Sequence, residues 1–229
     1  MYLLCGGGVT RKDIINKIQS ILNIAPQELT VLNLMHLEAQ IENIEKFRKN
    51  AHEYEYIIFV SPSCIDYVAD VIPQLKNTIF LVMGDFSYNY LRKLTQLEIL
   101  YPHINKGAEG LISEVVSGLD LSNKKTLLVK GSGGNLTLQK KIQSYCKSCD
   151  GLDIYHRVGL VISEIDFKNY INNCSGIIVT SSLFATYLFE LAKQYSVVDK
   201  LQNTEFITWH AKIRNTLYRH GVRKVYPSS

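Results

Sequence analysis

The sequence predicts an α/β fold made of two similar parallel-sheet domains, with one domain inserted into the other. Three observations lead to this prediction: apolar runs alternate with amphipathic ones, two stretches of the chain are repeated, and the predicted strands divide unevenly along the sequence. Alternation of strands and helices is typical of parallel sheets that carry helices on both faces.

Ten short apolar runs are the predicted strands. Most of them lack polar alternation, as expected for strands that are buried on both faces. In chain order they cover residues 2–5, 29–34, 56–60, 78–84, 97–102, 126–131, 152–158, 176–181, 205–210 and 223–227. The predicted helices between them cover residues 13–23, 39–51, 64–75, 88–94, 110–119, 136–147, 167–173, 182–195 and 211–220.

Two stretches of the first half of the chain recur in the second half. FVSPSCIDYV, which begins at Phe59, resembles IVTSSLFATY, which begins at Ile178. NTIFLVMGDFSYNYL, from Asn77, resembles NTEFITWHAKIRNTL, from Asn203, and each copy is followed by a strand that ends in Tyr-Pro. Two copies of one unit predict two similar, flavodoxin-like domains.

The strand count predicts how the chain passes between these domains. The segment from Ala39 to Leu152 supplies one set of strands, whereas the segment through Asn33 supplies only two and needs the last three to complete a sheet. The predicted boundaries are 1–33 plus 159–229 for domain one, 39–152 for domain two, and 34–38 with 153–158 for a two-stranded ladder that joins them.

Composition narrows the class of protein. The 229 residues are 46% hydrophobic and carry a net charge of +4, which is too small for the dense basic surface of a nucleic-acid binder but suits an anionic small-molecule ligand. The start of the chain has no basic leader, and no apolar run approaches a membrane span. The five scattered cysteines fit reduced thiols. We therefore expect a cytoplasmic protein without nucleic-acid or membrane partners.

Loops rich in hydroxyls and glycine follow several predicted strands and precede helices. Residues 61–63, 84–87, 130–135 and 180–182 are the clearest cases. Free N–H groups at helix starts attract carboxylate or phosphate, although any single loop is explained equally well by helix capping. Because such loops line the ligand crevice of parallel sheets, together they predict an anion-binding cleft between the domains.

The glycine-rich loop that begins at Gly131 departs from known nucleotide-binding patterns. Leu136 occupies the position of a third glycine, so the loop matches neither G-x-G-x-x-G nor G-x-x-x-x-G-K-[ST]. Asp153 follows the glycine-rich loop at a spacing where an acidic residue could bind the ribose of a nucleotide. It falls, however, on a predicted ladder strand. A nucleotide site therefore has weak support.

Nucleophilic and metal-dependent chemistry also have weak support. The sequence has no G-x-S-x-G nucleophile motif. Cys146 and Cys149 form one C-x-x-C at the end of a polar helix, where surface thiols are the simpler interpretation. His156 and His210 lie near predicted cleft loops, and each is more simply a structural histidine.

Together these motifs resemble the uroporphyrinogen-III synthase family from about Leu29 to Tyr226. The resemblance depends on the order and spacing of IIFVSPSCIDYV, LVMGDFSYNYL, TLLVKGSGGNLTLQKKI, LDIYHRV, IIVTSSLFATYLF and FITWHAKIRNTL. It implies that linear hydroxymethylbilane loses water and closes to uroporphyrinogen III, with the terminal pyrrole ring inverted through a spiro intermediate. It also implies no metal or organic cofactor.

The resemblance assigns roles to individual residues. The family's tyrosine of the second crossing strand is Tyr155, the expected catalytic residue. The resemblance also matches substrate-binding positions to Ser87, Gly131, Asn135, Thr180 and Ser181. The helix starts and cations of the predicted cleft add the other expected substrate-binding residues: Ser61, Ser63, Gly84, Lys130, Ser182 and Lys212. Lys130 and Lys212 are expected at the rim of the cleft, where their charges would attract the carboxylates of the substrate.

The chain departs from the family pattern at two places. His210-Ala211-Lys212-Ile213 stands where the family usually has a glycine followed by threonine, which removes a hydroxyl contact and adds a cation. Gly6-Gly7-Gly8 is also unusual for the family. We expect a monomer that contacts the preceding pathway enzyme transiently. Two other readings remain: a non-catalytic tetrapyrrole-binding homologue and a two-domain nucleotide-sugar-dependent transferase.

Overall fold

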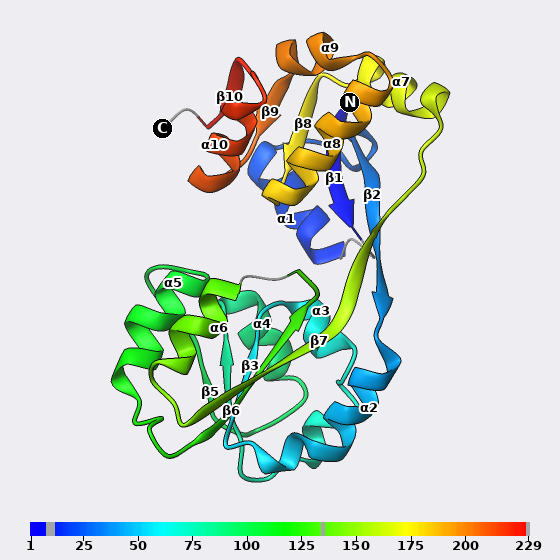
Figure 1. Cartoon of the computed structure of the whole chain (residues 1–229). Helices are drawn as coiled ribbons and strands as arrows, with labels where there is room; N and C mark the ends of the chain where they lie inside the picture. The colour runs from blue at the N-terminus through cyan, green and yellow to red at the C-terminus, as the bar shows by residue number, and fades with distance from the viewer. Residues whose placement is uncertain (8–11, 134–135, 228–229) are drawn as a thin grey trace. The chain divides into compact units, whose positions relative to one another are not determined.

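The computed structural model describes residues 1–7, 12–133 and 136–227. The chain divides into two compact units (Figure 1). Unit 1 comprises Met1–Leu37 and Val158–Ser229, and unit 2 comprises Glu38–Arg157. Each unit contains parallel strands with helices between them, so the predicted α/β fold class is confirmed.

Unit 1 has a parallel sheet in the order β10-β9-β8-β1-β2. Numbered along unit 1, this order reads 2-1-3-4-5 from the β2 side, which is the doubly wound order of flavodoxin-like folds. Its strands are β1 (Tyr2–Gly7), β2 (Leu29–Ala39), β8 (Gly176–Val179), β9 (Glu205–Ile207) and β10 (Lys224–Tyr226).

Helices cover both faces of the sheet in unit 1. They are α1 (Lys12–Leu22), α7 (Glu164–Asn173), α8 (Ser182–Gln194), α9 (Val198–Asn203) and α10 (Ala211–Arg219). Alternate side chains of β1 point to opposite faces. Leu3 and Cys5 belong to the larger core with α7, α8, α9 and α10, whereas Leu4 packs with Ile18 of α1. This two-sided burial explains why the strands read as continuous apolar runs.

Unit 2 has a parallel sheet in the order β7-β6-β3-β4-β5. Its strands are β3 (Tyr56–Phe59), β4 (Ile79–Val82), β5 (Ile99–Leu100), β6 (Lys125–Gly131) and β7 (Ser148–Gly159). Its helices are α2 (Ile41–Asn50), α3 (Pro62–Asp66), α4 (Asp85–Leu91), α5 (Ala108–Gly110) and α6 (Leu136–Gln143). Ile58 and Leu128 pack toward α6, whereas Phe59 stacks on Phe80 at 5.9 Å.

The two units share one spatial strand order but differ in where the chain enters it. β6 and β7 of unit 2 occupy the places of β1 and β2 in unit 1, and β3, β4 and β5 occupy those of β8, β9 and β10. Unit 2 is therefore a circular permutation of the arrangement in unit 1. This relation explains why the sequence repeat begins at β3 in one copy and at β8 in the other.

The strand register shifts the predicted alignment of the first repeat by one residue. Phe59 pairs with Val129, two residues before the end of β6, and Val179 pairs with Cys5, two residues before the end of β1. Phe59 therefore corresponds to Val179, and its predicted match with Ile178 was wrong. In strands that are apolar on both faces, a shift of one residue leaves the hydrophobic pattern unchanged, so the sequence could not fix this register.

Both units also interrupt their strand pairing at the same place. Gly7, at the end of β1, lies opposite Met35, and Gly131, at the end of β6, lies opposite Tyr155. In each case one residue of the neighbouring strand is skipped, which is the signature of a bulge. Bulges re-aim the side chains beside them, so Tyr155 and Met35 occupy corresponding positions in the two units.

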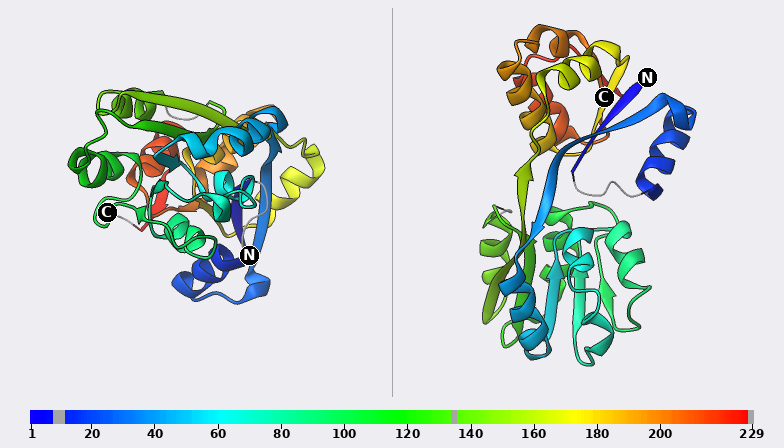
Figure 2. Two further views of the ribbon diagram at one scale, coloured as in Figure 1. Left: turned by 90° about the horizontal axis from the view of Figure 1, so that it is seen from below. Right: turned by 90° about the vertical axis from the view of Figure 1, so that its right-hand side faces the viewer.

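β2 and β7 each run across the boundary between the two units (Figure 2). In unit 1 the backbone N–H of Leu160 donates to the carbonyl of Leu34 at 2.9 Å, and in unit 2 the N–H of Gln40 donates to the carbonyl of Ile154 at 3.0 Å. The residue numbers of the bonded partners decrease along the second segment as they increase along the first. The two crossing segments are therefore antiparallel.

Several observed helices differ in extent from the predicted ones. The predicted helix over residues 64–75 is reduced to α3 and a 3-10 turn at Ile72–Gln74, where Pro73 lacks the N–H that a continuous helix requires. Helix α9 was not predicted, since its six residues carry too short a pattern. In the part of the chain that the structure describes, no helix is long and apolar enough to cross a membrane.

Candidate active site

Strand connections in unit 2 reverse direction between β3 and β6. From β3 the chain proceeds through β4 to β5, and it then returns to β6 and β7 on the other side of β3. Ligands of open parallel sheets bind outside the carboxyl ends of the strands at such a switch point. The loops that follow β3 and β6 therefore mark the expected site in unit 2.

Tyr155 lies at this switch point, and other side chains surround its hydroxyl. The phenol oxygen is 3.2 Å from Ser61 Oγ, and Nη2 of Arg157 donates a hydrogen bond to it at 3.1 Å. The ring packs against Tyr67 with centroids 5.8 Å apart. Tyr155 is only 2% exposed, so these neighbours enclose its side chain.

The environment keeps the Tyr155 phenol protonated. Burial raises its pKa, and the nearby thiol of Cys64 adds to the rise, whereas the bond from Ser61 and the charge of Arg157 act in the opposite direction. The net shift is upward from an ordinary value of about 10. The phenol is therefore neutral at pH 7 and able to donate its proton.

The Tyr155 ring occupies the space that a side chain at position 131 would need. A Cβ at Gly131 would lie 2.3 Å from Cε2 and 2.5 Å from Cζ of Tyr155, far inside van der Waals contact. The bulge brings these two residues opposite each other, so a side chain larger than hydrogen is excluded. The glycine that the sequence assigned to substrate binding thus has a structural role beside Tyr155.

Ser132 anchors the loop that follows β6. Its backbone N–H donates to the carbonyl of Tyr155 at 2.8 Å, its carbonyl accepts from Nη1 of Arg157 at 3.4 Å, and its hydroxyl accepts from Nε2 of Gln40. Gly133 has φ of +69°, a conformation that favours glycine. Asn135, the remaining predicted binding residue of this loop, lies outside the described residues.

Ser61 and Ser181 occupy corresponding positions but have different partners. Each stands directly before a helix, α3 or α8. Ser181 caps α8, because its Oγ accepts the N–H of Leu183 at 3.2 Å. The Ser61 hydroxyl is instead directed to Tyr155 and to Cys64 Sγ, which lies 3.4 Å away. Ser181 therefore caps a helix, whereas Ser61 contacts the phenol of Tyr155.

We expect these two serines to respond differently to replacement by alanine. Ser181→Ala should destabilise the protein by about 1 kcal/mol through loss of a cap, with little change in kcat. Ser61→Ala should affect kcat more than the melting temperature, because its hydroxyl contacts Tyr155. Thermal unfolding and steady-state kinetics of both variants test this, and identical effects in the two would contradict it.

The other predicted binding residues with hydroxyl groups or glycine differ from one another in exposure and in position. Ser87 is 4% exposed inside α4, so it does not present its hydroxyl as a surface binding group. Ser63 is half-buried in the five-residue α3, and Gly84 lies against the side chain of Lys106. In unit 1, exposed Thr180 and half-buried Ser182 lie at the start of α8.

Lys130 is not the rim cation that the sequence predicted. It is 6% exposed, and its ammonium pairs with the carboxylate of Asp153. The register of β6 and β7 places the two residues side by side, which the sequence alone could not reveal. The pair neutralises both charges, whereas Lys212 is exposed in the first turn of α10.

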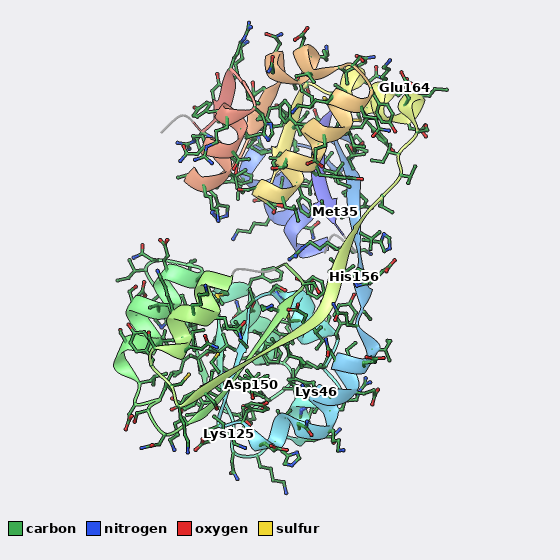
Figure 3. All side chains as sticks on the ribbon, viewed as in Figure 1. Met35, Lys46, Lys125, Asp150, His156 and Glu164 are labelled. Carbon is green, nitrogen blue, oxygen red and sulfur yellow. The ribbon has the colours of Figure 1, made fainter. Side chains whose placement is uncertain are left out.

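The remaining titratable candidates have ordinary structural surroundings. His156, labelled on β7 in Figure 3, is 2.8 Å from a carboxylate oxygen of Glu38, and His210 directly precedes α10. Burial raises the pKa of Cys149 to about 12 and also raises that of Cys146. Both thiols therefore stay protonated at pH 7, which disfavours nucleophilic or metal-binding roles.

The sequence analysis did not identify Arg157 and Gln40 as residues that contact Tyr155 and Ser132. Arg157 follows Tyr155 by two residues, and alternate residues of a strand share a face, so the strand prediction contained a signal for it. Gln40 gave no such signal, because its contact with Ser132 joins segments far apart in the sequence.

The structure defines a protein of two parallel α/β units in which unit 2 holds a buried, protonated phenol at the switch point of its sheet. The chain belongs to the uroporphyrinogen-III synthase family, since residues 21–229 match the family described as Uroporphyrinogen-III synthase HemD. Its members are cyclising hydro-lyases of tetrapyrrole and haem biosynthesis.

Solved structures with these two units share the fold. A uroporphyrinogen-III synthetase from Helicobacter pylori aligns with a TM-score of 0.62 at 11% identity, over 100% of this chain and 93% of that one. A mutant uroporphyrinogen III synthase from the extremely thermophilic bacterium Thermus thermophilus aligns with a TM-score of 0.58 at 11% identity, over 98% and 92%. No curated protein matches the sequence significantly.

Proposed function

We propose that this chain converts hydroxymethylbilane to uroporphyrinogen III and that Tyr155 donates the proton for the loss of water. The observation that supports this role most directly is the phenol held between Ser61 and Arg157. In the proposed step, the pyrrole nitrogen pushes electrons toward the hydroxymethyl carbon. The carbon–oxygen bond breaks, the phenol proton joins the departing hydroxyl, and water leaves.

The two units would contribute unequally to this reaction. Met35 of unit 1 stands where unit 2 has Tyr155, and a thioether cannot donate a proton. We therefore assign proton donation to unit 2. In unit 1, Thr180, Ser182 and Lys212 stay predicted carboxylate-binding residues, since the first two lie at the start of the 13-residue helix α8 and the third is an exposed cation.

Control of geometry would be the main contribution to catalysis. The substrate is a flexible chain of four pyrroles, and in the absence of enzyme it closes without ring inversion. Holding its two ends in a single arrangement lowers the barrier for one closure mode. A neutral proton donor and fixed binding groups meet this requirement without a strong nucleophile.

The test is a direct assay with freshly generated hydroxymethylbilane. After oxidation of the products, the uroporphyrin isomers are resolved and compared with an enzyme-free control. We expect isomer III to dominate. Isomer I alone would contradict the proposal and favour a non-catalytic tetrapyrrole-binding homologue. Thermal stabilisation by a nucleotide sugar would favour a transferase, although the pairing of Asp153 with Lys130 engages the carboxylate that ribose would need.

Activity should survive dialysis against a chelator and require no added nucleotide. Cys146 and Cys149 would have to be thiolates to hold a metal, and burial keeps the pKa of both thiols high. The measurement is the rate of isomer III formation before and after chelation. Loss of activity that zinc restores would contradict this expectation.

We further propose that the enzyme acts as a cytoplasmic monomer, with transient contact to the enzyme that supplies its substrate. Hydroxymethylbilane closes spontaneously, so rapid transfer would favour isomer III. Sedimentation of the purified chain, alone and with the supplying enzyme, tests the monomeric state and the contact.

A further inference from the structure

Arg157 contacts Tyr155 through both its charge and its donors. Nη2 donates to the phenol oxygen at 3.1 Å, and the guanidinium carbon lies 5.2 Å from the centroid of the ring. The two residues are separated by one position on β7 and therefore share a face of the strand. The contact is thus a direct consequence of strand geometry.

A second, longer hydrogen bond connects the guanidinium to the backbone. Nη1 of Arg157 donates to the carbonyl of Ser132 at 3.4 Å, and the N–H of Ser132 donates to the carbonyl of Tyr155 at 2.8 Å. The planar guanidinium therefore joins the phenol to the loop that follows β6. An ammonium group could not span both acceptors with the same fixed geometry.

The chemistry of these groups fixes the direction of the hydrogen bonds. A guanidinium only donates, so the oxygen of Tyr155 must accept from Arg157. The phenol hydrogen must then point away from Arg157, and Ser61 Oγ lies 3.2 Å from the same oxygen. We propose that Arg157 is a positioning residue that directs the Tyr155 proton toward the substrate and stabilises the phenolate left after transfer. This inference rests on the proposed function.

The proton balance closes over one turnover. The O–H bond of Tyr155 breaks as the proton joins the departing hydroxyl, which leaves as water with the electrons of its carbon–oxygen bond. The phenolate remains 3.1 Å from the Arg157 cation. It recovers a proton when the pyrrole carbon that closes the macrocycle loses its hydrogen.

Charged and titratable groups around the phenol act in opposite directions. Cys64 and Tyr67, which approach from α3 and the turn after it, raise the pKa of Tyr155. Ser61 and the Arg157 cation lower it. Arg157 therefore counteracts the effect of burial, which is the behaviour required of a group that stabilises the phenolate.

Arg157→Met tests the proposal, because methionine keeps an unbranched apolar stem and removes the donors and the charge. We expect kcat to fall about 10-fold, as for loss of one hydrogen bond from a charged group, with little change in KM. Arg157→Lys should recover part of the loss. In a Tyr155→Phe background, Arg157→Met should cause no further loss, because the oxygen on which it acts is absent.

Arg92→Met is the matched control. Arg92 lies over the ring of Tyr88 at 5.6 Å, and its Nε is 3.4 Å from that hydroxyl, so it makes the same kind of contact elsewhere in unit 2. We expect its kcat to stay at the wild-type value. An equal fall in kcat for Arg92→Met and Arg157→Met would overturn the proposal, as would a 10-fold loss that persists without the Tyr155 hydroxyl.

A measurement without substrate separates this proposal from the proposed function. In protein with isotope-labelled tyrosine, the Tyr155 resonance is assigned by its loss in Tyr155→Phe, and its titration is followed by NMR. Arg157→Met should raise the pKa of Tyr155, and an unchanged titration would overturn the positioning role even if isomer III forms. If Arg157→Met does not fold, Arg157→Lys must still shift the resonance. Absence of isomer III from the wild type, with the NMR shift present, would contradict only the proposed function.

Discussion

Replacement of Tyr155 by phenylalanine is expected to lower kcat by about 100-fold, near the lower end of the range for a positioned general acid. The change removes the oxygen that contacts Ser61 at 3.2 Å and Arg157 at 3.1 Å. The loss stays near the lower end because the pyrrole nitrogen also drives departure of the hydroxyl. The ring should remain against Tyr67, so KM and the melting temperature should change little.

Tyr54→Phe is the matched control for this experiment. Its hydroxyl also makes a side-chain hydrogen bond in unit 2, donating to Asp150 at 2.7 Å, but Asp150 lies in the first half of β7, away from its carboxyl end. We expect Tyr54→Phe to keep the wild-type kcat. Unchanged turnover in Tyr155→Phe would assign Tyr155 to packing alone.

The pH dependence of kcat gives a second check on Tyr155. Because burial raises the pKa of the phenol above its ordinary value of about 10, the protonated donor persists through neutral pH and is lost only in more alkaline solution. The wild type should therefore show no decline attributable to this group between about pH 7 and 9. An alkaline decline centred near pH 8 that is absent from Tyr155→Phe would contradict the upward shift.

Much of the fold could be predicted because its signal is local. Buried parallel strands are short apolar runs, and each of the ten predicted runs overlaps an observed strand. Register is different, since it depends on pairing between distant segments. The predicted match of Phe59 with Ile178 was wrong by one residue, because neither strand has a polar face that distinguishes the two alignments.

The site could be predicted only in part, for a related reason. The family resemblance assigned Tyr155 as the tyrosine of the second crossing strand, and the strand pattern itself carried the information that Arg157 shares its face. Lys130 was assigned to the rim because it precedes a loop. Only the pairing of β6 with β7 reveals that Asp153 lies beside it and neutralises its charge. Similarly, the burial of Ser87 depends on how α4 packs.

Replacement of Gly131 by alanine is expected to lower activity about as much as loss of the Tyr155 hydroxyl itself. The new Cβ would lie 2.3 Å from Cε2 and 2.9 Å from the hydroxyl oxygen of Tyr155, so the ring must move. Movement of the ring breaks the contacts with Ser61 and Arg157 together. We expect kcat to fall by about 100-fold, since the general acid is displaced, and the free energy of unfolding to fall by about 1–3 kcal/mol.

Two comparisons attribute this effect to the Tyr155 ring. Gly118→Ala is the control, because a Cβ there would meet open space among the described residues and should leave kcat and stability nearly unchanged. In a Tyr155→Ala background the ring that collides with the new methyl group is gone, so Gly131→Ala should then cost little further stability. Chemical denaturation of the four proteins in this cycle measures the coupling. If Gly131→Ala destabilises both backgrounds equally, the glycine serves the backbone of the β6 loop, and the close approach of Tyr155 is not the reason that a side chain is excluded.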